Sequence, residues 1–346
     1  MKPMEDSIYR RLQEKINGYF PGYPATSSGV ELKILKILFS EEDAEIYMKM
    51  DSVPETLEMI AQRFGEDVDK TTMDMERMVE RGSVLCMEME GRKVYSPAPY
   101  MVGLYENIVK LMDKEVAGLL EQYHKEVYFK HFADNAPPLI KYIPVQEALE
   151  ATPEVFPHDD VLKILKSKNK IAVIECACRK QVSLTGTPTK PIEVCFSFNE
   201  YADYYAKERK QGRYLSLDEA IEIQKQCEAA GLVTMSTVMK DHQIMCHCDK
   251  HCIALRSWGN RRPADHFKSN YYSQVDTESC TGCEECLERC PIEAITIGED
   301  QVAVINLERC MGCGLCVTIC PGESLSLEKK ADDALIKELV NKEDLH

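Results

Sequence analysis

The sequence lacks any apolar run long enough to cross a bilayer, for which an α-helix needs about 20 consecutive, mostly apolar residues. Hydrophobic residues make up 44% of the chain and charged residues 29%, and the mean hydropathy is −0.32, all ordinary for a globular protein. The first residues, Met1 to Asp6, also lack the apolar core of a signal peptide. We therefore expect a cytoplasmic protein without a membrane span.

Nucleotide-binding loops are also missing. No Gly-rich dinucleotide or Walker motif occurs, and the turn from Thr185 to Pro188 lacks the lysine and the second glycine of a phosphate-binding loop. A bound nucleotide is not predicted.

Basic residues are scarce relative to acids, since 42 Lys and Arg stand against 58 Asp and Glu, a formal charge of −16. Such a balance opposes binding to the phosphate backbone of nucleic acid. It suits docking to a basic patch on a partner protein, where complementary charge mainly raises the rate of encounter.

Cysteine is abundant, with 16 residues. In a reducing compartment these thiols are expected to serve metal or redox chemistry, because stable disulfides are rare there. Eight of them form two copies of C-x2-C-x2-C-x3-C-P, thirty residues apart. The flanking residues match at the same offset, so the whole unit is duplicated. The two runs are Cys280, Cys283, Cys286 and Cys290, and Cys310, Cys313, Cys316 and Cys320.

Residues 270 to 330 with this repeat resemble the bacterial two-cluster ferredoxin. The resemblance implies two [4Fe-4S] clusters whose fourth ligands are exchanged between the repeats. One cluster would take Cys280, Cys283, Cys286 and Cys320, and the other Cys310, Cys313, Cys316 and Cys290. Zinc is the alternative metal, because four-thiolate zinc sites also use C-x2-C pairs, although two such identical runs are much rarer there.

Six further cysteines lie between the N-terminal region and this repeat, and they predict a third metal site. Positions i and i+2 of a strand face the same side. Cys176 with Cys178, and Cys246 with Cys248, could therefore each present two sulfurs to one metal. A third iron-sulfur cluster is favoured over zinc, and the sequence does not select four ligands among the six. The six are Cys176, Cys178, Cys195, Cys246, Cys248 and Cys252. Cys86 and Cys227 are interpreted as packing residues.

The stretch from Pro99 to the C-terminus also resembles a largely uncharacterised family of anaerobic iron-sulfur proteins. The matching pieces include Glu175 to Arg179, Cys195, Leu215 to Val233 and Ile244 to Cys252, besides the terminal repeat. Family members typically carry a denser cysteine cluster in the Ile244 to Cys252 segment, where this chain has Asp249 and His251. The resemblance implies a class of protein and no substrate.

The N-terminal region resembles a winged helix. Helical spacing over residues 5 to 17 is followed by three predicted short helices, with caps at Ser40, Ser52 and Asp69, and by a hairpin from Val84 to Ser96. The helix that would enter DNA, residues 70 to 81, carries three basic and three acidic side chains and so has no net positive charge. Nucleic acid is therefore a disfavoured partner for this module.

The remaining pattern predicts one long helix from Tyr100 to His131, a linker at Pro137, Pro138 and Pro144, and a strand at Ile171 to Ile174. A capping box of Ser216 with Glu219 starts a helix that Gly231 ends, and Trp258 to Tyr272 is an irregular connection.

We therefore predict an α+β multidomain fold. Its parts are a winged-helix-like module at 1–98, a central α/β cysteine-rich domain at 99–264, a two-cluster ferredoxin domain at 265–330, and a C-terminal helix or tail at 331–346.

The predicted function is single-electron transfer through [4Fe-4S] clusters, to or from a larger oxidoreductase or a flavoprotein, in an anaerobic metabolism. The chain itself is expected to be a non-catalytic subunit. Two alternatives are a redox- or cluster-sensing DNA-binding regulator, and an iron-sulfur enzyme with an open iron at the central cysteines. The sequence specifies neither the reduction potentials nor the oligomeric state.

Overall fold

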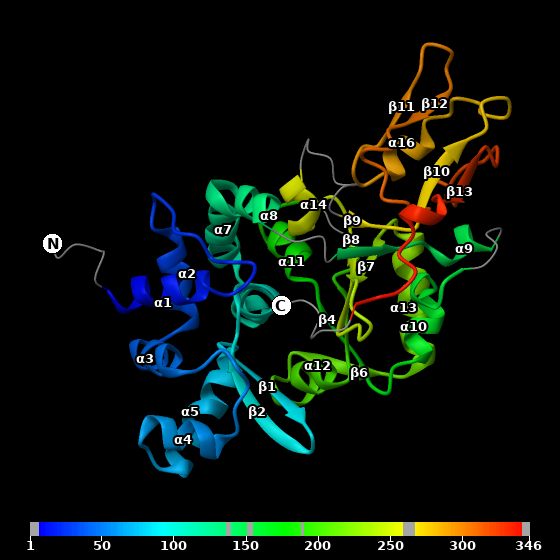
Figure 1. Cartoon of the computed structure of the whole chain (residues 1–346). Helices are drawn as coiled ribbons and strands as arrows, with labels where there is room; N and C mark the ends of the chain where they lie inside the picture. Colours follow the sequence, from blue (N-terminus) through cyan, green and yellow to red (C-terminus); the bar gives the residue numbers. More distant parts are fainter. Residues whose placement is uncertain (1–6, 136–139, 151–154, 188–189, 259–266, 341–346) are drawn as a thin grey trace. The chain divides into compact units, whose positions relative to one another are not determined.

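The computed structural model shows a mixed α+β fold and describes residues 7–135, 140–150, 155–187, 190–258 and 267–340 (Figure 1). The predicted linker prolines Pro137 and Pro138 and the connection around residues 261–263 lie outside these ranges. Among the described residues, no helix is both long and apolar enough to span a membrane. The chain divides into two compact units: unit 1 comprises residues 1–136, 172–192 and 200–214, and unit 2 the remainder.

Unit 1 begins with five helices and a hairpin: α1 (Ile8–Asn17), α2 (Val30–Leu38), α3 (Glu41–Lys49), α4 (Leu57–Phe64), α5 (Val68–Arg81), β1 (Val84–Met89) and β2 (Arg92–Pro97). The Ser40 hydroxyl accepts a hydrogen bond from the Asp43 amide, and the Asp43 carboxylate accepts one from the Ser40 amide. This capping box and the predicted hairpin are confirmed. A bridge between Glu55 and Tyr95 adds a third extended segment to the hairpin.

Two predicted caps in this region need correction, and one helix was missed. Ser52 caps no helix; it bonds its neighbour Asp51, and α4 begins after Thr56 instead. The cap of α5 is Asp67, whose carboxylate accepts from the amide of Asp69 in the first turn. Helix α2 was missed because its N-cap is Gly29, in the left-handed conformation, which provides no side-chain signal.

The single long helix predicted from Tyr100 to His131 is also wrong. A short helical stretch ends at Leu111, where Met112 turns extended, and the carboxylate of Asp113 then caps a new helix by accepting from the amide of Val116. An apolar periodicity can continue across such a break, because the two pieces can bury the same stripe. The elements are η2 (Tyr100–Leu104), α6 (Tyr105–Asn107), η3 (Ile108–Leu111), α7 (Lys114–Tyr123), η4 (His124–Tyr128) and α8 (Phe129–Asn135).

Unit 1 is completed by segments from later in the chain: β4 (Ile171–Glu175), α11 (Ala177–Leu184), α12 (Glu200–Asp203), η6 (Tyr204–Glu208) and β6 (Gly212–Leu215), with β6 beside β4. The buried guanidinium of Arg209 donates to the carbonyls of Val79, Glu80 and Asn107. The bonds to Val79 and Glu80 contribute to satisfying the last carbonyls of α5, where the helix itself supplies few donors.

Unit 2 contains a sheet whose neighbouring strands follow the order β5 (Glu193–Phe198), β8 (Ile244–Cys248), β7 (Val233–Thr237), β3 (Ile140–Ile143) and β9 (Phe267–Lys268). The neighbours are antiparallel except β3 and β9. The predicted capping box of Ser216 with Glu219 starts α13 (Leu217–Ala229). Unit 2 also contains α9 (Gln146–Leu149), η5 (Pro157–Asp159), α10 (Val161–Lys166) and α14 (Ile253–Trp258).

A fully buried ion pair fixes β3 in this unit. The ammonium of Lys141 bonds the carboxylate of Asp159, and the second carboxylate oxygen accepts from the side-chain amide of Asn270 at 2.7 Å. A buried charge is tolerated when it is paired and hydrogen-bonded in this way. The pair joins β3 to the segment that leads into the cysteine repeat.

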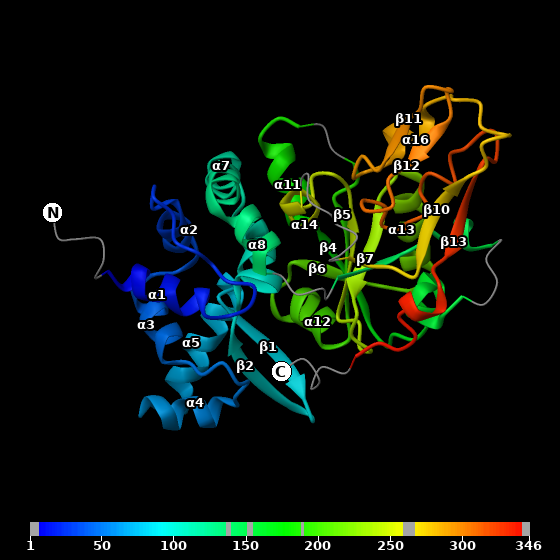
Figure 2. The ribbon, with the colours of Figure 1, turned by 45° about the horizontal axis from the view of Figure 1, so that its top comes forward.

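The cysteine repeat forms two antiparallel strand pairs, β10 (Tyr271–Val275) with β13 (Leu325–Lys329) and β11 (Ile295–Ile297) with β12 (Ala303–Ile305), together with α16 (Glu285–Arg289). Figure 2 shows β10 and β13 running together. After β13, the described part of the chain contains one 3-10 turn, η7 (Asp332–Ala334).

Candidate metal centre

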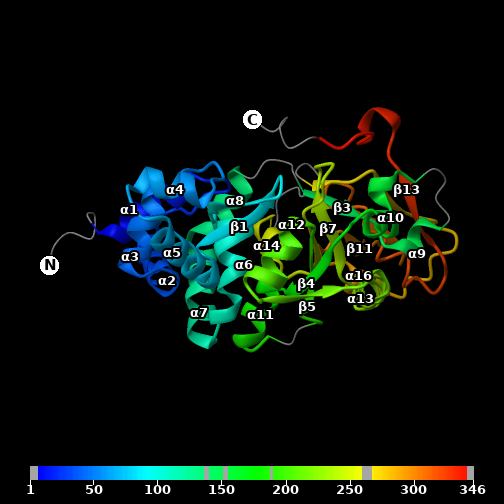
Figure 3. The ribbon, with the colours of Figure 1, turned by 90° about the horizontal axis from the view of Figure 1, so that it is seen from below.

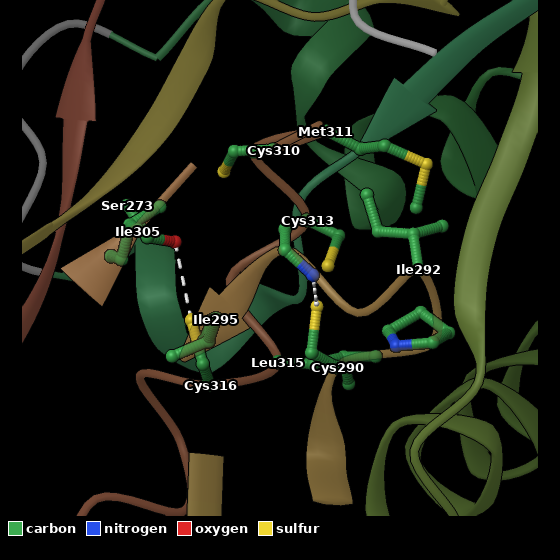
Figure 4. Close-up of a pocket in the computed structure, with 13 residues that line it drawn as sticks. Ser273, Cys290, Ile292, Ile295, Ile305, Cys310, Met311, Cys313, Leu315 and Cys316 are labelled. Carbon is green, nitrogen blue, oxygen red and sulfur yellow. Dashed lines mark hydrogen bonds between the residues drawn. The ribbon is translucent and has the colours of Figure 1, made fainter. Parts of the chain in front are cut away.

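Two cavities of nearly equal size lie in the repeat, enclosing about 350 and 330 Å³ of space that is partly open to solvent. The first is lined by Cys290 together with Cys310, Cys313 and Cys316, as Figure 4 shows. The second is lined by Cys320 together with Cys280, Cys283 and Cys286. Each cavity thus combines three cysteines of one repeat with the last cysteine of the other.

The backbone around the cavities repeats with the thirty-residue offset of the sequence. The amide of Asp276 donates to the carbonyl of Ser324 at 2.8 Å, and the amide of Asn306 donates to the carbonyl of Ala294 at the same distance. Both bonds join the start of one cysteine run to the end of the other. This reciprocal pairing explains how the fourth cysteine of each run reaches the other cavity.

Glycine is required within both cysteine loops. Gly282 and Gly312 have φ values of 66° and 60°, which residues with a side chain rarely adopt. A Cβ on Gly312 would lie 2.1 Å from the carbonyl oxygen of Tyr271, and one on Gly282 would lie 2.3 Å from that of Gln301. The loops therefore lie directly against the backbone of β10 and of the turn between β11 and β12.

Several polar groups contact the sulfur atoms. The amide of Ala294 donates to the Cys290 sulfur at 3.3 Å, and the amide of Ala303 donates to the Cys280 sulfur at 3.5 Å. The hydroxyls of Ser273 and Ser324 lie 3.2 Å from the sulfurs of Cys316 and Cys320. Hydrogen bonds to thiolate sulfur stabilise negative charge and tune the reduction potential of an iron-sulfur centre. These two serines were not predicted, because no sequence motif marks them.

The free thiols differ in acidity. Burial raises the pKa of Cys316 to about 12 and that of Cys313 well above its ordinary value. For Cys320, burial acts in the same direction, but hydrogen bonds from the Ser324 side chain and nearby amides outweigh it and lower the pKa. Thiolate, not thiol, ligates metal, so loading the first cavity must displace firmly held protons.

The arrangement of the side chains does not by itself identify a metal site. Among the residues that the structure describes, no three His, Cys, Asp or Glu side chains are already arranged to hold a metal ion. This applies equally to the eight cysteines around the two cavities. Their chemistry nevertheless fits iron-sulfur clusters, because each cavity offers four sulfur donors and amides directed at sulfur.

The six central cysteines fall into two groups. Cys246 and Cys248 lie on β8, as predicted for a strand pair, and the thiol of Cys248 makes hydrogen bonds with those of Cys246 and Cys252. Cys195 lies on β5 in the same unit. The strand argument fails for Cys176 and Cys178, because Cys176 is the N-cap of α11 and Cys178 lies within that helix, where positions i and i+2 do not share a face.

The thiol of Cys178 instead hydrogen-bonds the buried phenol of Tyr105 within unit 1. Cys86 on β1 and Cys227 on α13 are buried, which agrees with a packing role. Burial raises the pKa of Cys86 to about 11, so this thiol stays protonated near neutral pH.

Tyr142 is a further residue that the sequence did not reveal. It is fully buried on β3, and its pKa is raised well above 10 by burial and then by the nearby thiols of Cys248, Cys252, Cys313 and Cys246. Its position beside thiols of two groups depends on strand register, which sequence spacing does not encode.

No curated protein matches the chain significantly. Residues 273–327 match a protein family described as the 4Fe-4S dicluster domain. A domain of this type implies two [4Fe-4S] clusters, an electron-transfer role and a redox partner. The chain therefore carries a dicluster ferredoxin domain near its C-terminus.

Proposed function

We propose that the protein transfers single electrons through two [4Fe-4S] clusters, to or from a larger partner oxidoreductase or flavoprotein. The observation that carries this proposal is the pair of cavities, each lined by four cysteines, inside the segment that matches the dicluster family. A cubane with four thiolate ligands has no open iron position, so it exchanges electrons without binding substrate. The eight cysteines would hold the two clusters, and each cluster would supply a centre that accepts and releases one electron.

The ligand sets proposed for the clusters follow the two cavities. One set is Cys290, Cys310, Cys313 and Cys316, and the other is Cys280, Cys283, Cys286 and Cys320. The reciprocal backbone pairing between the repeats supports this exchange of the fourth ligand.

Anaerobic purification with iron and acid-labile sulfide counting tests the function. The two clusters should supply about eight irons per chain and show reversible one-electron reductions at low potential. Zinc in both cavities, or iron that does not change oxidation state reversibly, would contradict it.

The exchanged ligands are tested by comparing Cys290→Ser with Cys320→Ser in the full-length protein. Electron paramagnetic resonance (EPR) should show that Cys290→Ser perturbs the cluster that Cys313→Ser also perturbs, and that Cys320→Ser perturbs the cluster that Cys283→Ser also perturbs. The opposite pairing would mean that each cluster is held within one repeat.

For the N-terminal module we propose a winged-helix fold that docks a protein and not DNA. The extended segment at Glu55 beside the hairpin supports the winged-helix interpretation. Two of the three cations of α5 are paired with carboxylates: Arg77 with Asp43 and Asp74 at 2.8 and 2.7 Å, and Lys70 with Glu66 at 2.9 Å. The third, Arg81, donates to the carbonyl of Ile37 at 3.3 Å. Cations paired in this way are poorly placed to replace counterions along a phosphate backbone.

An electrophoretic mobility shift at physiological salt tests the DNA alternative. The full-length protein should bind duplex DNA no better than an acidic control protein of similar charge. Sequence-specific binding below micromolar concentration would favour the regulator.

A further inference from the structure

One face of the unit 2 sheet collects thiols that line neither cavity of the dicluster domain. Cys246 and Cys248 are two residues apart on β8 and therefore point to the same face. Cys252 lies immediately before α14, and its thiol hydrogen-bonds that of Cys248. Cys248 also interacts with Cys246, so its thiol lies beside both of the others.

The register of the neighbouring strand brings a fourth cysteine to this face. On β5, Phe196 pairs with Met245, so the next pair in the same register is Cys195 with Cys246. The ring of His247 contacts the carbonyl of Val194, which continues this register one pair further. Directly opposed residues of antiparallel strands share a face, with Cβ atoms about 4.5–5.5 Å apart.

The histidines and the carboxylate near these thiols have other roles. His247 points to the opposite face, where its Nε2 contacts the side-chain oxygen of Gln224 at 2.6 Å. The Nδ1 of His242 contacts the hydroxyl of Ser236 at 2.9 Å. Asp249 accepts from the amide of His251 at 2.9 Å. The Nδ1 of His251 lies 3.4 Å from the same carboxylate. We therefore assign the four sulfurs, and neither the histidines nor Asp249, as the donor set.

A row of residues on the same sheet face connects the thiols to the strand that contacts the dicluster domain. Tyr142 on β3 pairs with Met235 on β7, and Met235 pairs with Cys246 on β8, so the three residues form one row across the sheet. Just after β3, the amide of Val145 donates to the carbonyl of Cys313 at 3.0 Å. Tyr142 itself is fully buried in this row.

A second contact joins the dicluster domain to the rest of unit 2. The guanidinium of Arg289, one residue before Cys290, donates to the carbonyl of Glu228 at 2.6 Å and to that of Ala229 at 3.1 Å. These bonds join the last residue of α16 to the C-terminal end of α13; the two helices are labelled in Figure 3. The dicluster domain is thus attached to the rest of unit 2 at two points, just after β3 and at the C-terminal end of α13.

We propose that Cys195, Cys246, Cys248 and Cys252 hold a third [4Fe-4S] cluster, which exchanges electrons with the cluster beside Cys313. This inference rests on the proposed electron-transfer function. Four thiolates are the ligand set of a cubane. In the exchange, the third cluster passes from 1+ to 2+ as its neighbour passes from 2+ to 1+, and no bond or proton moves.

The alternative metal, zinc, takes the same four thiolates but cannot change oxidation state. With zinc at the four thiols, the row of Tyr142, Met235 and Cys246 would connect the dicluster domain to a metal that cannot exchange electrons with it. The contacts with the dicluster domain therefore favour iron over zinc.

Iron and sulfide counts on the full-length protein, purified anaerobically, test the inference. The wild-type protein should contain about twelve irons, four more than two cubanes need. Cys248→Ser and, independently, Cys246→Ser should each lower this to about eight while both dicluster EPR signals remain. The retained signals show that the variants have folded. The EPR spectrum of the fully reduced wild-type protein should also show a magnetic interaction between the third cluster and the cluster beside Cys313. This interaction should be absent in Cys248→Ser.

Cys227→Ser is the matched control, because Cys227 is a buried thiol of the same unit on α13 and should leave twelve irons. Loss of the four irons in Cys176→Ser would overturn the proposed ligand set, and zinc in place of the four irons would overturn the cluster. If the dicluster signals are present and Cys248→Ser leaves the iron content unchanged, this inference alone fails. If the wild-type protein lacks those signals, the proposed function fails.

Discussion

Single residues determine whether the cysteine loops can approach their neighbours. At Gly312 both the positive φ and the carbonyl of Tyr271 exclude a side chain, whereas Gly91 in the N-terminal hairpin has a φ of 74° but open space around it. Alanine at Gly91 would meet only backbone strain, whereas alanine at Gly312 would meet both backbone strain and a steric clash, so the two variants separate these effects.

Gly312→Ala should therefore lower the iron content by about four atoms per chain, because the loop that carries Cys310 and Cys313 must move. Gly91→Ala meets only the strain of its positive φ and should leave the iron content unchanged, with a loss of stability of about 1 kcal/mol. Iron assays and anaerobic denaturation measure the two effects. Full iron content in Gly312→Ala would show that the loop tolerates the displacement.

A buried histidine makes unit 2 sensitive to acid. Burial, followed by the charges of Lys168 and Lys141, lowers the pKa of His242 to about 4, below the ordinary value of 6.5. The unfolded chain then binds more protons than the folded chain between these two values. The stability that depends on neutral His242 is present above about pH 6.5 and is lost as the pH falls towards 4.

Lowering the pH from 7.5 to 5.5 should thus cost the wild-type protein about 1 kcal/mol through this residue. His242→Gln can keep a hydrogen bond to Ser236 but cannot titrate, so its stability should fall less over the same interval. Anaerobic denaturation at both pH values gives the comparison, and equal losses in the two proteins would show that His242 does not contribute.

At the scale of elements, the sequence predicted well those features that depend on neighbours along the chain. The capping boxes at Ser40 and Ser216 and the hairpin after α5 were found because their signals lie within a few residues. Helix α2, which starts at Gly29, and the break at Met112 have no such signal. The grouping of Cys195 with Cys246 depends on strand register, so the sequence could nominate six cysteines but could not choose among them.

The two serines at residues 40 and 52 provide a direct test of local capping. Ser40→Ala should destabilise the protein by about 1 kcal/mol, because the amide of Asp43 loses its acceptor. Ser52→Ala is the control, since this exposed hydroxyl contacts only the neighbouring Asp51 and should change stability by less than about 0.5 kcal/mol. Equal effects in chemical denaturation would mean that the cap at Ser40 contributes nothing specific.

At the scale of the whole molecule, the excess of acids determines how partners approach. The formal charge of −16 becomes roughly −20 with two oxidised [4Fe-4S] clusters, because eight thiolates outweigh two 2+ cores. Many basic side chains are also neutralised locally, as Lys93 is by Glu208 at 2.7 Å. A partner with a basic docking surface therefore gains the most from long-range attraction.

Electron exchange with small redox mediators should consequently depend on their charge. Raising the ionic strength from about 0.01 to 0.1 M shortens the Debye length from about 30 to 10 Å, so it should slow oxidation of the reduced protein by a cationic mediator. The same change should accelerate oxidation by an anionic mediator and leave a neutral one unaffected. Stopped-flow measurements at matched driving force separate these cases. A rate with the cationic mediator that does not fall with salt would mean that electrons leave the protein through a surface without net negative potential, and that the acidic excess plays no part in partner encounter.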